Sequence, residues 1–126
     1  MPSKIQRFRI KSGAIAAGGG ATAYSSTISG KILAVHVNYP TNTCTVDLDT
    51  YGETPTQKIL DLAAANTDKT YYPRTPVCTN TGAETVLSYT ALKVYEPFVV
   101  HGKILLTIAA GTAAEEVTVD IIVECY

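Results

Sequence analysis

Short runs in which apolar and polar residues alternate constrain the fold of this chain more than any other feature. Thr43–Thr50 (TCTVDLDT), Lys103–Ala109 (KILLTIA) and Glu116–Glu124 (EVTVDIIVE) all follow this pattern. A side-chain period of two places the apolar residues on one face of a β-strand. Turn residues separate such runs. The sequence therefore predicts an all-β fold, a single β-sandwich or jelly-roll-like domain of about eight short antiparallel strands.

The same alternation predicts which side chains face the core. The predicted inward residues of the three runs are Cys44, Val46, Leu48, Ile104, Leu106, Ile108, Val117, Val119, Ile121 and Val123. Lys31–Asn38 (KILAVHVN) has apolar residues on both faces. Leu33, Val35 and Val37 share one of these faces and Ile32, Ala34 and His36 share the other, so we expect this strand to be covered on both sides.

Two glycines are predicted at turns. Ser29-Gly30 is expected to separate a strand over Ala21–Ile28 from the one over Lys31–Asn38, because glycine tolerates positive φ. His101-Gly102 is expected to be the two-residue turn of a hairpin formed by Phe98–Val100 and Lys103–Ala109.

Residues 56–66 carry conflicting signals. Thr54-Pro55-Thr56-Gln57 resembles a helix-capping box, and the alanines that follow favour a helix. The all-β pattern of the other segments favours a strand. We expect a strand here, and the short helix remains the alternative.

The N-terminal segment is basic and rich in glycine. Lys4, Arg7, Arg9, Lys11 and Lys31 are the only charged side chains before Asp47, in a chain whose net charge is −1. Residues 1–20 are predicted to form an extended arm, and residues 21–126 the β-sandwich domain. The alternatives for Lys4–Lys11 are an edge strand guarded by its charges and an arm that docks on an acidic neighbour. Direct nucleic-acid binding is not expected.

No set of residues suggests catalysis. His36 is expected to be a hydrogen-bonded sheet residue and His101 a solvated one, while Asp47 and Asp49 are expected on a solvated strand face. We therefore predict no enzyme activity, no catalytic residues, no cofactor and no metal site. Cys44, Cys78 and Cys125 lack a C-x-x-C pair and are expected to be reduced, with Cys125 the candidate for a disulfide to a neighbouring chain.

The stretch Asn66–Gly82 (NTDKTYYPRTPVCTNTG) departs most from the alternating pattern. Its tyrosines have apolar rings with polar tips, which suit contacts between subunits. Arg74 is expected to donate hydrogen bonds to a neighbouring carboxylate or carbonyl. The predicted contact residues of the chain are Lys4, Arg7, Arg9, Lys11, Tyr71, Tyr72, Arg74 and Cys125.

The runs Gly30–Tyr39 (GKILAVHVNY), Asn66–Arg74 (NTDKTYYPR), Gly102–Ala109 (GKILLTIA) and Val117–Ile121 (VTVDI), together with TCTVDLD, resemble the small accessory virion proteins of tailed bacteriophages. The resemblance implies a β-sandwich that packs on a capsid or neck as a small oligomer, often a trimer. It implies a capsid decoration (cement) protein that binds the major capsid protein or another virion protein. The alternatives are a neck, collar or tail accessory protein and a carbohydrate- or host-receptor-binding module.

The expected location is the capsid surface of the virion, after assembly in the host cytoplasm. No apolar run approaches the ~20 residues that a membrane span requires, and no signal peptide is recognised. No membrane association is expected.

Overall fold

The computed structural model describes residues 4–52, 55–78, 80–84, 86–87, 92–93 and 95–125, and every regular element within these ranges is a β-strand. The strands are β1 (Lys4–Lys11), β2 (Ala21–Tyr24), β3 (Ile28–Asn38), β4 (Cys44–Tyr51), β5 (Lys58–Ala65), β6 (Lys69–Tyr71), β7 (Arg74–Pro76), β8 (Val86–Leu87), β9 (Leu92–Lys93), β10 (Tyr95–Pro97), β11 (Val99–Ala109) and β12 (Thr118–Cys125). The predicted all-β class is confirmed. A helix long and apolar enough to cross a membrane is absent from the ranges given above.

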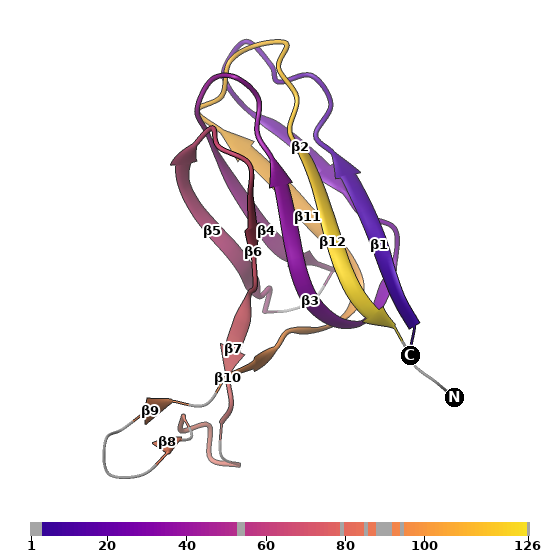
Figure 1. The fold of residues 1–126 in the computed structure, drawn as a ribbon, viewed down its shortest axis with the longest axis vertical. Coiled ribbons are helices and arrows are strands. Elements are labelled where there is room, and N and C mark those ends of the chain that lie inside the picture. The colour runs from indigo at the N-terminus through magenta and orange to yellow at the C-terminus, as the bar shows by residue number, and fades with distance from the viewer. Residues whose placement is uncertain are drawn as a thin grey trace.

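Eight strands form one antiparallel sheet whose main path is β1-β12-β3-β11-β4-β5. β2 pairs with β11 and β6 pairs with β3, beside this path. β11 joins the two halves of the sheet, because Val99–Gly102 pairs with β3 whereas Lys103–Ala109 pairs with β4. Figure 1 shows β1, β12 and β3 in front of β11 and β4, with β1 and β5 at opposite sides of the molecule.

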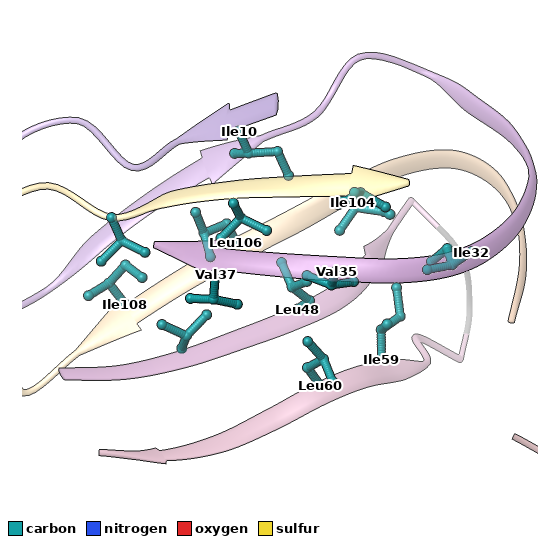
Figure 2. Close-up of a cluster of buried hydrophobic side chains, with 14 of the residues drawn as sticks. Ile10, Ile32, Val35, Val37, Leu48, Ile59, Leu60, Ile104, Leu106 and Ile108 are labelled. Carbon is teal, nitrogen blue, oxygen red and sulfur yellow. The ribbon is translucent and has the colours of Figure 1, made fainter. Parts of the chain in front are cut away.

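The hydrophobic core lies between these two halves, as Figure 2 shows. Val35 and Val37 contribute from β3, and Leu48 and Leu106 from β4 and β11, each with at most 1% of its surface exposed. Full burial of such a side chain contributes about 1.5–3 kcal/mol. The alternation predicted for the three runs is confirmed, since all ten predicted inward residues are buried.

Gly30 and Gly102 do not lie in turns, so both turn predictions were wrong. β3 and β11 are continuous through them and are 11 residues long each. A Cβ atom at Gly30 would overlap the carbonyl oxygen of Glu124 on β12. Glycine is therefore needed there for the close approach of a neighbouring strand, not for a reversal of the chain. Gly102 is the last residue of β11 that pairs with β3 before the strand continues along β4.

β3 is irregular at Leu33. The register between β3 and β12 shifts there, which leaves Leu33 without an opposite residue. One extra residue in a strand reverses the alternation of faces beyond it. Ile32 therefore faces the core together with Val35 and Val37. The prediction that Leu33 shares the core face of Val35 was wrong for this reason.

The predicted strand at residues 56–66 is confirmed as β5. β5 pairs with β4, and its Ile59 and Leu60 are 5% and 9% exposed in the core. Pairing with β4 and burial of these side chains outweigh the local helix signals. The register to β4 shifts twice along β5.

Within residues 4–20, the predicted extended N-terminal arm is not observed. Lys4–Lys11 is edge strand β1, which pairs with β12 along its whole length. Ile10 and Ile15 belong to the core, each with 2% exposed. Ser12 binds Val117 twice, through its backbone N–H at 2.9 Å and its hydroxyl oxygen at 2.9 Å. The edge-strand alternative for this segment is confirmed, because burial of these isoleucines fixes it on the sheet.

A different segment projects from the body. β7 pairs with β10, and β8 pairs with β9, as two separate two-stranded sheets. In Figure 1 these strands extend away from the eight-stranded sheet. We refer to residues 74–97 as the β-arm. Its described parts are 74–78, 80–84, 86–87, 92–93 and 95–97.

Candidate interaction surfaces

The four predicted basic contact residues lie on β1, at one end of the sheet path. Arg7, Arg9 and Lys11 point outward, because they alternate with Ile10, which enters the core. Lys4 lies on the opposite strand face and is exposed. Among the described residues, neither Arg7 nor Lys11 has an ion-pair partner. These two exposed cations are available for contacts with another molecule.

Arg9 is committed to Asp120 on β12. Its Nε donates to Oδ1 at 2.8 Å and its Nη2 donates to Oδ2 at 3.1 Å. The Asp120 side chain is 7% exposed, whereas that of Arg9 is 53% exposed, so the guanidinium covers the carboxylate. The hydrogen bonds from Arg9 lower the pKa of Asp120 below its ordinary value, and the charges of Arg9 and Arg7 add to this. We call β1 and β12 the basic end of the sheet.

His36 continues this polar row across β3 to β6. It stands opposite Asp120 on one side and Thr70 on the other. Its Nδ1 and the Thr70 hydroxyl lie 2.6 Å apart in a hydrogen bond, as expected for a sheet histidine. A shallow depression of about 380 Å³ lies along the row, lined by Arg7, His36, Val37, Asn38, Asp68, Lys69, Thr70 and Asp120. Both oxygens of Asp120 accept hydrogen bonds from Arg9, and the row joins β1, β12, β3 and β6.

The opposite end of the sheet is acidic. Asp47 on β4 stands directly opposite Asp61 on β5, and Oδ1 of Asp47 is buried without a hydrogen-bond partner in the described ranges. Burial raises the pKa of Asp47, and the neighbouring Asp61 raises it further. The nearby Lys58 pairs instead with Asp49, its Nζ 3.2 Å from Oδ1. We call β4 and β5 the acidic end.

The stretch Asn66–Gly82 leads from the sheet into the β-arm. Tyr71, predicted as a surface contact, is half-buried and packs against the core, because its position on β6 faces inward beside Val35. Tyr72 is 66% exposed, in agreement with a contact role. Arg74 donates from Nη1 to its own chain, to the carbonyls of Pro73 at 2.8 Å and Leu33 at 3.3 Å. The bond to Leu33 connects the base of the β-arm to β3.

Two tyrosines that the sequence did not single out as a pair meet on the outer surface. Tyr24 on β2 and Tyr51 on β4 are 51% and 48% exposed, and their rings meet edge to face with centroids 4.7 Å apart. Leu105 of β11 stands opposite Tyr24 and also opposite Asp49. The alternation of β4 places Tyr51 on the outward face, but only the register with β11 brings the two rings together.

The cysteines differ in exposure, and all three are free. Cys44 is buried, Cys78 is exposed and Cys125 is half-buried, with its Sγ 3.3 Å from Oε1 of Gln6. The most accessible thiol is therefore Cys78 at the β-arm, whereas Cys125, the predicted candidate for a disulfide to a neighbouring chain, is half-buried. The sequence alone does not indicate how exposed Cys78 and Cys125 are, because the distance of a residue from the terminus does not determine its burial.

Neither the chemistry of the described residues nor the comparisons assign a reaction. Within the described ranges no group of three His, Cys, Asp or Glu side chains could hold a metal ion. His101 lies within β11 with Nδ1 3.3 Å from the hydroxyl of Ser29. No family model, curated protein or solved structure matches this chain.

Proposed function

We propose that the protein is a structural component of a virus particle, a capsid decoration protein that binds and stabilises the head shell of a tailed phage. The proposed partner is the major capsid protein or another protein of the particle, and the proposed state is a trimer. The virion assignment rests on the resemblance of the runs quoted above. The observation that carries a contact role is the β-arm.

The β-arm consists of strand pairs only two or three residues long that project from the body (Figure 1). A two-stranded ribbon is marginally stable unless another surface packs against it. Tyr72 just before the β-arm and Tyr95 on β10 are 66% and 55% exposed, and Val99 just beyond the β-arm is 58% exposed. A neighbouring protein that covers these side chains would supply the missing packing.

Particle binding by tyrosine variants tests this proposal. Tyr72→Ser with Tyr95→Ser should lose binding to purified shells that lack the protein, measured by co-sedimentation. Tyr24→Ser with Tyr51→Ser is the matched control, since these tyrosines are similarly exposed but lie on the body, and it should bind as wild type does. Absence of wild-type binding to shells would contradict the proposal.

Imaging of the intact particle distinguishes the location. Density at the three-fold positions between capsomers is expected for a decoration protein. Density confined to the tail vertex would support a neck, collar or tail accessory protein instead.

The Tyr24–Tyr51 pair favours a second candidate, a carbohydrate- or host-receptor-binding module. Exposed aromatic faces beside a carboxylate such as Asp49 suit stacking on a sugar and hydrogen bonding to its hydroxyls. A glycan array separates the two candidates. Binding that is lost in Tyr24→Ser with Tyr51→Ser would favour this module over decoration.

A further inference from the structure

The two ends of the sheet path leave free backbone edges. Within the described ranges, β1 and β5 each pair with a strand on one side only, and no strand is hydrogen-bonded to the other side. A free edge presents N–H and C=O groups to which an extended segment can add. The two edges are not equivalent, because their regularity differs.

β5 is a poor template for strand addition. Its register to β4 shifts twice, and such irregularities twist an edge and break the even spacing of its free groups. β1, in contrast, pairs with β12 through eight successive residues without a shift. The outer edge of β1 therefore keeps the regular spacing that another strand requires.

Charge selects what can pair with β1. Its eight residues include Lys4, Arg7, Arg9 and Lys11 and no acidic residue. Two copies of β1 would place cations opposite cations, which opposes pairing between identical edges. Arg9 already covers Asp120, whereas Arg7 and Lys11 remain exposed and unpaired in the described chain. An added strand that carries carboxylates would instead be attracted to these cations.

We propose that the free edge of β1 binds an acidic extended segment of a partner protein by strand addition. The segment hydrogen-bonds along the outer edge of β1, and its carboxylates meet Arg7 and Lys11. These two cations are about 13 Å apart along the strand, so the matching carboxylates are four residues apart in the segment. An apolar residue of the segment lies opposite Ile5, which is 59% exposed. The inference rests on the proposed function only for the source of the segment, a protein of the particle.

Synthetic peptides test the chemistry directly. The probes are an eight-residue peptide of alternating valine and glutamate, the same peptide with lysine for glutamate, and glutamate peptides with alternate amides N-methylated in either phase. The glutamate peptide should bind at least about tenfold more tightly than the lysine peptide in 50 mM salt. It should also slow hydrogen exchange of the β1 amides. N-methylation in the phase that faces β1 should abolish binding, because it removes the backbone donors.

Variants locate the site. Arg7→Glu with Lys11→Glu should reverse the preference, so that the lysine peptide binds more tightly than the glutamate peptide. Lys103→Glu, which changes an exposed lysine on β11, is the matched control for Arg7→Glu and should keep the wild-type preference. Circular dichroism of each variant verifies that the fold is retained.

Three results would overturn the inference: equal binding of glutamate and lysine peptides, equal binding of both N-methylated peptides, or an unchanged preference in Arg7→Glu with Lys11→Glu. If any of these occurs while wild-type protein binds particles, the proposed function stands without this inference. Selective protection of β1 by the glutamate peptide, without particle binding, would support the site and contradict the proposed function.

Discussion

The basic and acidic ends of the sheet differ in what surrounds their carboxylates. At the basic end, Asp120 is covered by Arg9 through two hydrogen bonds and its pKa is lowered. At the acidic end, Asp47 faces Asp61 across two strands, and burial together with Asp61 raises its pKa. The strand register differs as well, being regular at β1 and shifted at β5.

At the basic end, the residue that stabilises the fold differs from the residues proposed to contact a partner. Arg9 neutralises the buried charge at the basic end, so Arg7 and Lys11 can serve an external partner without exposing Asp120. At the acidic end, Lys58 forms its ion pair with Asp49. The facing carboxylates of Asp47 and Asp61 therefore repel each other and destabilise the folded state. The comparison therefore predicts that removal of the Asp120 charge lowers the free energy of unfolding, whereas removal of the Asp47 or Asp61 charge raises it.

Gly30→Ala should give the largest effect, because the added Cβ overlaps the carbonyl oxygen of Glu124 and separates β3 from β12. We expect a loss of about 3 kcal/mol in the free energy of unfolding, measured by urea denaturation. Hydrogen exchange should increase more at the basic end than at the acidic end. Gly18→Ala, where a Cβ has open space, is the control and should change little. Equal destabilisation by both variants would argue against the close approach as the cause.

Asp120→Ala should give the next largest loss in the free energy of unfolding. It removes the acceptor of both Arg9 hydrogen bonds at the basic end, so we expect a loss of stability that is smaller than that of Gly30→Ala, because the exposed Arg9 guanidinium is screened by solvent. Thermal and urea denaturation both measure the loss. Glu116→Ala, which removes an exposed carboxylate just before β12, should be near neutral. A neutral Asp120→Ala would show that Arg9 does not stabilise this end.

The pH dependence of stability should differ between the ends. The stabilisation from Asp120 is fully present above its ordinary pKa of 3.8 and is lost as pH falls through the lowered value. For Asp47 the sign is reversed: ionisation costs the folded state, so its contribution declines as pH rises from 3.8 through the raised value.

Urea denaturation at a series of pH values measures both contributions. The stability lost in Asp120→Asn should be greatest near neutral pH and vanish in acid. The stability gained in Asp47→Asn should also be greatest at neutral pH. Loss of stability at neutral pH in both variants would contradict the predicted opposition.

Asp61→Asn should give the smallest effect and a favourable one. It removes one of two facing carboxylates, and like charges directly opposite cost roughly 0.2–1 kcal/mol. Asp49→Asn is the matched control on the neighbouring strand and should reduce stability slightly, because Lys58 loses its partner. A loss of stability in Asp61→Asn would show that the facing pair is not repulsive.

The sequence predicted the strands in which only one face packs against the core, because apolar and polar residues alternate there. The core residues of β4, β11 and β12 followed from alternation because each strand has one buried face. Leu33 was assigned to the wrong face, since the bulge depends on the register with β12. Gly30 and Gly102 were placed in turns because glycine also permits turns, and only the neighbouring strands show that the chain continues.

The exposure and pairing of the predicted contact residues followed from the sequence only in part. The row Arg7, Arg9 and Lys11 is outward and basic as its sequence indicates, but the burial of Asp120 under Arg9 joins residues 111 positions apart. Tyr71 and Tyr72 are adjacent tyrosines that the sequence does not distinguish. The pairing of β6 with β3 places the Tyr71 side chain inward. The β-arm was not predicted, because its short strands lack an alternating pattern and β1 was assigned the projecting role.

The most direct test of the opposed ends is the titration of the individual aspartates, followed by the carboxyl carbon chemical shifts in nuclear magnetic resonance. We predict that Asp120 titrates below the ordinary value of 3.8 and that Asp47 titrates above it. In Arg9→Ala, Asp120 should shift upward while Asp47 remains unchanged. Equal values for the two groups, or an Asp120 that titrates above Asp47, would contradict the account.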